Sequence, residues 1–508
     1  MNKARHPLLV TMSVMLASFL YSLDWTIVAV ALPHMQGTFS ATQDQISWVI
    51  TSYIVAAAIS LPTAGWLAAR FGRKRMFLWA TTIFLIASIV CGMANSLELE
   101  IAARIVQGLG GAFLIPISLA IILDTYPPAE QGKAMSIWAI GSTGGSFMGP
   151  LLGGMLTEYF SWRYTFYINI PVGILALIGT FLFVPETERD KQRPLDWFGF
   201  ATLAMGIGSL QLMLDRGGRL DWFESWEIVI EASCSALGFY LFLAHSFTTK
   251  IPFLDLKLFL NRNFVIGLIF SAGYGGMTTP PLVLMPAFLQ ELQGYPIDTV
   301  GFLLAPRGLG LLISMVIGGR MLGKIDARWQ MAAGLIMLAV SSLEMATWTP
   351  GVSLWPLLWT NFLQGAGGGI MLVPNQAIGF STLPAEKRTE AAALFNLVRS
   401  VAASVGVSAA LALFLRTSSI SRAYMTEHIS PYSAALAQSG SAGVWDIHTA
   451  QGLATLAHEI DRQAVMLGYM GDFRMFAIAA LLGLPLLLFV GSDADRAKRV
   501  KLQEVHYE

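Results

Sequence analysis

The stretch RIVQGLGG at residues 104–111 returns 257 residues later as NFLQGAGG at residues 361–368, and each copy lies inside a long apolar segment. Both copies keep a Gln-Gly-x-Gly-Gly pattern. Small residues at these spacings let helix backbones approach closely in lipid, where little hydrophobic force holds helices together. The repeat therefore predicts a duplicated membrane bundle with a packing seam at each copy.

One position separates the two copies, because Arg104 in the first is replaced by Asn361 in the second. An ionisable residue at membrane depth is a functional hypothesis by default. Arg104 keeps its proton, so its useful roles are to influence a nearby carboxylate or to attract an anionic group. The alternative is an arginine that caps backbone carbonyls at a helix break.

The composition is that of a polytopic membrane protein, with 508 residues of which 55% are hydrophobic and 13% charged. A formal net charge of zero, without a basic stripe interleaved with aromatics, indicates no nucleic-acid partner. Cys91 and Cys234 lie in separate apolar segments without metal-ligand spacing, which supports neither a disulfide nor zinc. Hydrolase and ATP-binding motifs are absent from the sequence, so we expect no enzyme and an external energy source.

Segmentation by apolar length predicts an all-α protein with fourteen transmembrane helices, since a bilayer core of about 30 Å takes roughly 20 residues as a helix. An even number of spans places both termini on one side. The expected spans are 9–32, 46–67, 76–95, 98–123, 133–157, 163–184, 197–215, 226–247, 263–290, 297–322, 329–348, 354–379, 391–415 and 472–491.

Basic residues alternate between the two sides of the predicted bundle. The loops on the side of the termini contain Lys or Arg, whereas loops 33–45, 291–296 and 349–353 on the other side contain neither. Cytoplasmic loops carry such an excess of Lys and Arg. Both termini are therefore expected in the cytoplasm.

The repeat spacing is longer than six helices with their loops, so two extra helices are expected between the halves. We predict an N-terminal six-helix bundle at 1–190, two linking transmembrane helices at 191–250 and a C-terminal six-helix bundle at 251–508. The last includes an extracytoplasmic loop at 416–470, and loops of this length are usually functional or disordered. Within it, apolar spacing at 450–467 favours a short amphipathic helix.

Asp24 stands alone among apolar residues in the first span. A buried carboxylate of this kind is suited to carry a proton, and the alternative is a structural carboxylate bonded to a neighbouring helix. By helix depth Asp24 is the nearest candidate partner of Arg104. We predict proton coupling at Asp24 and Arg104, both in the N-terminal half.

Residues 145–154, GSFMGPLLGG, place four glycines and a proline in one membrane helix. Helix-breaking residues there need neighbours to satisfy backbone groups, which predicts a close, bendable seam; plain helix packing explains it equally well. The gating candidates are Gly145, Gly149, Pro150, Gly153 and Gly154. A basic cytoplasmic turn supplies Gly65, Arg70, Gly72 and Arg73.

Candidates for a substrate cavity are buried charges and aromatic residues, although core packing is the commoner fate of such side chains. Arg307 is a further buried cation, and a purely structural role is sufficient to explain it. The cavity candidates are Tyr53, Tyr274, Phe288, Phe362, Phe395, Glu344 and Arg399.

These motifs resemble the major facilitator superfamily, specifically its fourteen-helix drug/proton antiporter branch. Residues 23–33, LDWTIVAVALP, look like the first-helix signature of that branch, whose aspartate is associated with proton coupling. Residues 104–111 look like the fourth-helix motif whose arginine is tied to proton transfer. Residues 145–154 resemble the fifth-helix motif of antiporters, which favours export over uptake.

The string LDRGGRLDWF at 214–223 and the long final outer loop are similar to EmrB-type multidrug efflux pumps. The resemblance implies a bacterial inner-membrane pump that exports hydrophobic or amphipathic drugs by alternating access, driven by the proton motive force without a cofactor. It also implies a periplasmic adaptor protein and an outer-membrane channel as partners. The loop motif departs from the superfamily at Ala69, where an acid is usual, so a latch that depends on that acid is not implied.

Two alternatives remain open, namely an uptake symporter of the same fold and a membrane sensor or scaffold without transport. The glycine-rich fifth helix argues against uptake. Asp24 and Arg104 argue against a passive scaffold, because buried ionisable groups are costly.

Overall fold

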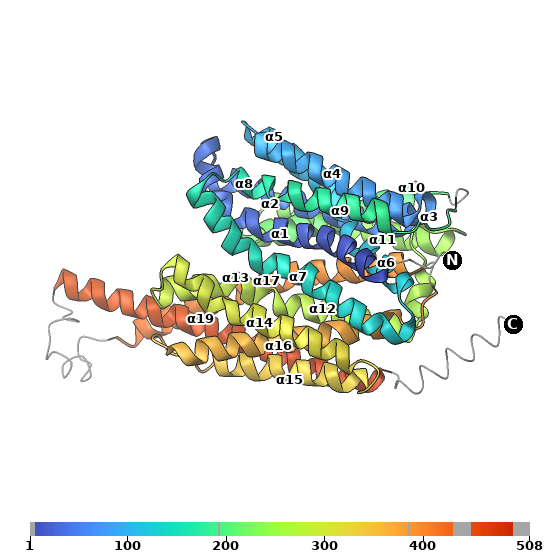
Figure 1. Cartoon of the computed structure of the whole chain (residues 1–508). Coiled ribbons are helices and arrows are strands. Elements are labelled where there is room, and N and C mark those ends of the chain that lie inside the picture. The colour runs from blue at the N-terminus through green and yellow to red at the C-terminus, as the bar shows by residue number, and fades with distance from the viewer. Residues whose placement is uncertain (1–5, 191–193, 385–386, 430–448, 491–508) are drawn as a thin grey trace.

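The computed structural model describes residues 6–190, 194–384, 387–429 and 449–490, and the chain is all-α as predicted (Figure 1). Within the described residues, each of the fourteen expected spans lies mainly on helix. In the described part of the chain, ten helices are long and apolar enough to cross a membrane. The other expected spans lie on interrupted or more polar helices, numbered α7, α12 with α13, α15 and α16, whose bounds follow.

The N-terminal helices include two that are interrupted, α2 with α3 and α5 with α6, where Pro62 and Gly111 lie near the breaks. Such interruptions are tolerated in membranes because neighbouring helices satisfy the freed backbone groups. The helices are α1 (Pro7–Phe39), α2 (Gln43–Ser60), α3 (Ala64–Phe71), α4 (Arg73–Met93), α5 (Leu97–Gly111), α6 (Leu114–Thr125), α7 (Pro128–Tyr159), α8 (Tyr164–Tyr167) and α9 (Asn169–Phe183).

The remaining helices follow in chain order after residue 194. Two prolines begin α13, which separates it from α12. The helices are α10 (Trp197–Arg216), α11 (Trp226–Thr248), α12 (Arg262–Thr278), α13 (Pro280–Ala287), α14 (Ile297–Met321), α15 (Ala327–Met345), α16 (Leu354–Phe380), α17 (Arg388–Glu427) and α19 (Ala450–Leu486).

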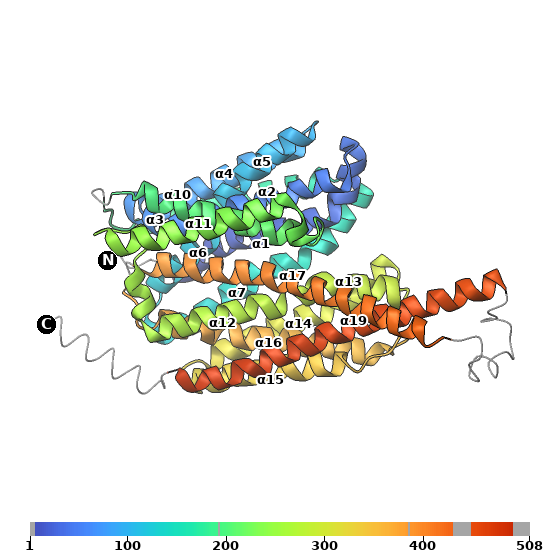
Figure 2. The same cartoon turned by 180° about the vertical axis from the view of Figure 1, so that it is seen from behind.

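The helices form two groups that lie one above the other in Figures 1 and 2. In the upper group α1 packs against α7 and α9, and α5 packs against α2 and α4. In the lower group α16 packs between α14 and α15, while α17 packs against α12 and α19. The contacts that join the groups come mainly from α7 with α14 and from α17 with α6 and α3.

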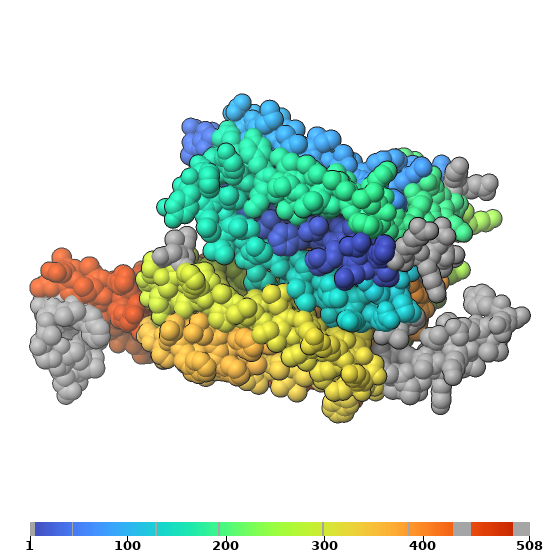
Figure 3. Space-filling view, in the orientation of Figure 1, coloured from blue at the N-terminus to red at the C-terminus, as the bar shows by residue number. Residues whose placement is uncertain are grey.

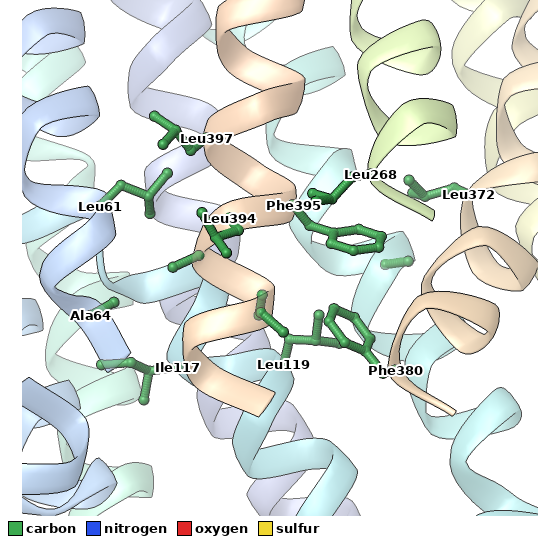
Figure 4. Packing of buried hydrophobic residues seen from close by; sticks show 14 of the residues in the cluster. Leu61, Ala64, Ile117, Leu119, Leu268, Leu372, Phe380, Leu394, Phe395 and Leu397 are labelled. Carbon is green, nitrogen blue, oxygen red and sulfur yellow. The ribbon is translucent and has the colours of Figure 1, made fainter. Parts of the chain in front are cut away.

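One apolar core crosses the boundary between the groups (Figure 4). Leu61, Ile117 and Leu119 reach it from the upper group, and α17 supplies Leu394 and Leu397. These side chains are buried. The two groups are therefore in close contact at this level of the bundle.

The start of α1 and the end of α19 lie at the same end of the bundle, which we call the terminal end. At the opposite end, the hairpin end, α17 and α19 project beyond the other helices and stand clear in the space-filling view (Figure 3). In its described part, the expected loop at 416–470 is therefore largely helical, since α17 continues to Glu427 and α19 begins at Ala450.

The short helix expected at 450–467 is instead the first half of α19, which continues into the last span without a break. The low apolarity of this segment predicts a loop, but two helices that pack on each other need only a narrow apolar stripe. The Phe414 and Tyr469 rings lie 4.7 Å apart, and Arg422 pairs with Asp461 at 2.8 Å. Residues 430–448 of the expected loop lie outside the described residues.

Helix α10 is hydrogen-bonded to both groups near the hairpin end. The Thr51 hydroxyl on α2 donates to Asp215. On the other side, Gln211 Nε2 donates to Ser404 Oγ on α17 at 2.7 Å, and Ser408 Oγ donates to the Leu214 carbonyl at 2.7 Å. Helix α10 thus connects α2 with α17 through its own side chains and backbone.

Candidate functional site

Asp24 and Arg104 form an ion pair inside the upper group. Arg104 Nη1 lies 2.6 Å from Asp24 Oδ2, and the two side chains are 1% and 0% exposed. Arg104 Nε donates to the Val49 carbonyl at 3.1 Å, and its guanidinium lies 4.0 Å from the centre of the Tyr53 ring. Arg104 thus both pairs with a carboxylate and caps a backbone carbonyl, so each reading from sequence describes part of its contacts.

The second oxygen of Asp24 is held by two amides. Gln107 Nε2 and Asn169 Nδ2 donate to Oδ1 at 2.9 and 3.0 Å. Asn169 also donates to Ser88 Oγ at 2.9 Å, and Arg104 Nη1 donates to Gln107 Oε1 at 2.7 Å. A buried ion pair is tolerated when further hydrogen bonds satisfy both partners. Protonation of Asp24 would cancel its charge and weaken its hold on Arg104, so the arrangement can report proton binding.

The glycine-rich segment of α7 faces the helix that carries Asp24. Gly145, Gly149 and Gly153, spaced by four residues, form one stripe against α1, where an added Cβ would overlap or crowd α1 atoms. Gly154 meets open space, and Pro150 lies exposed within α7. Three of the five gating candidates therefore build the α1–α7 seam, and the other two lie outside it.

The repeated motif marks equivalent seams in the two groups. A Cβ on Gly108 would lie 2.5 Å from the Tyr53 carbonyl oxygen of α2. A Cβ on Gly365 would overlap the Arg307 carbonyl oxygen of α14. Tyr53 and Arg307 therefore occupy corresponding places, and the second group carries its cation on α14 instead of on the repeated motif.

The basic turn lies at the terminal end, where it joins the two groups. Arg73 pairs with Asp124 at the end of α6 and donates to Thr389 Oγ1 on α17 at 3.1 Å. Arg388 on α17 also pairs with Asp124, at 3.2 Å. Gly65 faces Glu390 closely enough that an added Cβ would lie 2.7 Å from Glu390 Cβ and 3.0 Å from its Cα. The terminal end is closed by these contacts.

A latch thus exists although Ala69 lacks the usual acid, because Asp124 supplies a carboxylate from α6. Gly72 connects α3 to α4 at a φ of +89°, a conformation that favours glycine. Arg70 lies half-buried at the end of α3. The sequence alone does not indicate Asp124, because an acid at a helix end is usually solvated.

A pocket between α6, α12, α16 and α17 brings together three of the cavity candidates, Tyr274, Phe395 and Arg399. Arg399 Nη2 donates to Asn396 Oδ1 at 2.7 Å. Asn375 also lines the pocket, and its buried side-chain oxygen has no partner among the described residues. The pocket therefore offers a cation and free polar groups beside aromatic rings, at the boundary of the two groups.

The remaining cavity candidates lie elsewhere. Tyr53 belongs to the ion-pair site, and Phe362 stacks on Trp359 with ring centres 6.2 Å apart. Phe288 is fully buried in a separate aromatic cluster. Glu344 lies half-buried near the end of α15. The structure does not bring these four to the pocket.

Arg307 is 3% exposed, and its Nη2 donates to the Thr278 carbonyl at 2.5 Å, where α12 ends. Its Nη1 is buried without a hydrogen-bond partner among the described residues. Among the described residues, no carboxylate lies within ion-pair distance of either Arg307 or Arg399. The lower group thus holds two cations near Tyr274 that lack a protein anion.

The family model described as Major Facilitator Superfamily matches residues 14–407, more than half of the chain. The chain belongs to the major facilitator superfamily. Proteins of this superfamily are transporters and not enzymes, so the chain is a multi-pass membrane transporter.

Curated relatives of this superfamily member include multidrug efflux proteins. It is 37% identical to the multidrug export protein EmrB of Escherichia coli K12 over 428 residues, 84% of this chain and 83% of the relative. It is 34% identical to EmrB of Haemophilus influenzae over 93% of this chain and 94% of the relative. It is 33% identical to the fatty acid resistance protein FarB of Neisseria gonorrhoeae over 94% and 95%.

Solved structures of other major facilitators share the fold. The human organic anion transporter MFSD10 aligns with a TM-score of 0.62 at 14% identity, over 95% of this chain and 99% of that one. The proton:xylose symporter XylE aligns with a TM-score of 0.63 at 14% identity, over 96% of each chain.

Proposed function

We propose that this transporter is a proton-driven exporter of hydrophobic or amphipathic compounds. The observation that carries the proposal is the buried Asp24–Arg104 pair, with both carboxylate oxygens satisfied. A proton on Asp24 removes the charge that holds Arg104, and loss of that proton restores the pair. The pair sits on α1 and α5, next to the α1–α7 glycine seam, so a change at Asp24 acts on helices that pack at the core of the upper group.

We place the terminal end in the cytoplasm of a bacterial cell, across the inner membrane, because the loops at that end carry the basic residues. The latch of Arg73, Asp124 and Arg388 then closes the cytoplasmic side. Transport consists of rocking between the bundles 1–190 and 251–508, with residues 191–250 as the linking helices. Release of the latch opens the path to the cytoplasm.

The pocket lined by Tyr274, Phe395 and Arg399 marks the proposed substrate site; its accessible volume is about 10 Å³ in this closed conformation, so it must widen before a substrate binds. Its aromatic rings suit apolar groups, and the Arg399 guanidinium, which has no carboxylate partner among the described residues, suits an acidic group on an amphipathic compound. The names of relatives agree with this range, since one is a multidrug export protein and another a fatty acid resistance protein.

The test is reconstitution of the purified protein into liposomes with an imposed pH gradient. A fluorescent amphipathic compound should move against its own gradient when protons move the opposite way. Adding the compound without a pH gradient should in turn drive protons across the membrane. Movement of compound and protons in the same direction would instead identify a symporter, and movement indifferent to pH would overturn proton drive.

We further propose that the projecting α17–α19 hairpin contacts a periplasmic adaptor protein, which in turn works with an outer-membrane channel. The hairpin lies at the end opposite the proposed cytoplasmic side and extends beyond the bundle. Its described part holds together by its own contacts, such as Arg422 with Asp461. The described ends of α17 and α19 that project beyond the bundle therefore contact each other.

Removal of residues 422–461, closed by a short glycine-serine turn, should leave transport in liposomes unchanged and lower drug resistance of intact cells by about tenfold. Resistance should fall because the drug must be transferred to a partner protein; a tenfold loss corresponds to about 1.4 kcal/mol of lost binding free energy between the hairpin and that partner. Arg422→Gln, which removes only the ion pair, is the control. Loss of transport in liposomes as well would show that the hairpin serves the fold.

A further inference from the structure

A second carboxylate lies buried beside the Asp24–Arg104 pair. Glu100 is in the first turn of α5, one helical turn before Arg104, and its side chain is 0% exposed. Neither of its oxygens accepts a hydrogen bond from an N–H or O–H group among the described residues. Glu98, two residues earlier, is exposed. The burial of Glu100 is therefore specific to that side chain and is not shared by the whole turn.

The groups around Glu100 link it to the ion pair. Glu100 interacts electrostatically with Cys91 on α4, with Arg104 on its own helix, with Asp24 on α1 and with Arg163 in the turn before α8. The Cys91 thiol also lies 3.7 Å from Gln107 Oε1, and Gln107 donates to Asp24. Polar side chains thus continue from Glu100 to Asp24 through the interior of the upper group.

Two buried carboxylates, Asp24 and Glu100, lie near one buried arginine in this cluster. Arg104 is engaged by Asp24 at 2.6 Å, which leaves Glu100 without a paired cation in the described part of the chain. An unpaired carboxylate is very costly to ionise in a site of low dielectric, so it takes up a proton instead. Neutral Glu100 beside the ionised pair gives the cluster a net charge of zero.

We propose that Glu100 is a second proton-carrying residue that exchanges its proton with Asp24. In one state Asp24 is ionised and paired with Arg104 while Glu100 carries the proton. In the other, the proton has passed to Asp24, Glu100 is ionised, and Arg104 has turned to it. Residues four apart share a helix face, so Arg104 reaches Glu100 without a helix shift. One proton moves, and the net charge stays at zero in both states.

The position of Glu100 gives the exchange a direction. Helix α5 begins at the hairpin end, so Glu100 lies nearer that surface than Asp24 does. On the orientation proposed above, on which this inference rests, Glu100 receives protons from the outer side and Asp24 takes them deeper. Outer pH then acts on transport through Glu100 first.

The test is Glu100→Gln in the full-length protein in liposomes, because glutamine imitates the protonated side chain but cannot release a proton. Export driven by a pH gradient should fall at least tenfold and lose its dependence on outer pH, while exchange of compound without a gradient continues. Glu98→Gln should behave like the wild type, and Glu100→Asp should recover part of the outer-pH response. Continued exchange shows that the variant is folded.

Wild-type export with an unchanged outer-pH profile in Glu100→Gln would overturn the proposal. Equal loss of driven export and of gradient-free exchange would also overturn it, since that pattern means a structural role. The proposed function fails separately, if the wild type itself shows no coupling. If Asp24→Asn uncouples transport and Glu100→Gln does not, proton drive stands and Glu100 has no part in it.

Discussion

Replacement of Asp24 by asparagine should reduce pH-gradient-driven export on the order of 100-fold or more. Asparagine keeps the size of the side chain but cannot ionise, so Arg104 loses its anion. Leaving one partner of a buried pair without the other costs about 3–5 kcal/mol. The variant can neither bind nor release the coupled proton, and its uncompensated arginine opposes return to the conformation seen here.

The measurement is driven export and gradient-free exchange of one fluorescent compound by matched amounts of protein. Asp44→Asn is the control, because Asp44 is an exposed acid at the start of α2 whose side chain is 88% accessible. Asp24→Glu, which restores an ionisable group on a longer side chain, should recover partial coupling. Normal driven export by a well-folded Asp24→Asn protein would exclude Asp24 from the proton path.

Substitution of Gly145 by alanine should abolish transport and lower the thermal stability of the protein. The new Cβ would overlap the Phe19 carbonyl oxygen and lie 2.7 Å from the Leu23 nitrogen, both in the backbone of α1. Backbone cannot turn aside as a side chain can, so α1 and α7 must separate. Overpacking of this kind costs about 1–3 kcal/mol. The displaced helix also carries Asp24, so the ion pair is disturbed as well.

Gly154→Ala is the matched control, because Gly154 belongs to the same motif and helix but has no atom within 4 Å of an added Cβ. Its transport and melting temperature should equal those of the wild type. Thermal melting in detergent and transport in liposomes distinguish the two variants. If both alanine variants were equally stable and active, close contact at the α1–α7 seam would not be a requirement of the mechanism.

The membrane spans could be predicted because apolar length is a local property of the chain. The Asp24–Arg104 contact could be anticipated only because the two residues lie at similar depths in their predicted spans. The geometry of the contact depends on how α1 packs on its neighbours, which the sequence does not show. Glu100 was missed because an acid in the first turn of a helix is ordinary, being favoured there by the helix dipole. Its burial depends on tertiary packing, which brings Cys91 of α4 to it and which no pattern within α5 reveals.

The α17–α19 hairpin escaped prediction for a different reason. Its residues are polar enough to read as a loop, yet two helices that satisfy their own backbone hydrogen bonds can extend into water while packing on each other. Asp124 was likewise missed, because its partners, Arg73 and Arg388, come from chain segments far apart in sequence. Contacts between the two groups depend on tertiary structure alone.

The bonds of α10 to both groups make the two flanks of the transporter mechanically unequal. On the flank that contains α10, Asp215 is hydrogen-bonded to α2 and Gln211 to α17, so α10 links these two helices near the hairpin end. Separation of α2 from α17 there requires that these hydrogen bonds lengthen or break. We therefore expect the two bundles to rotate about an axis along α10, so that the flank far from α10 opens more widely.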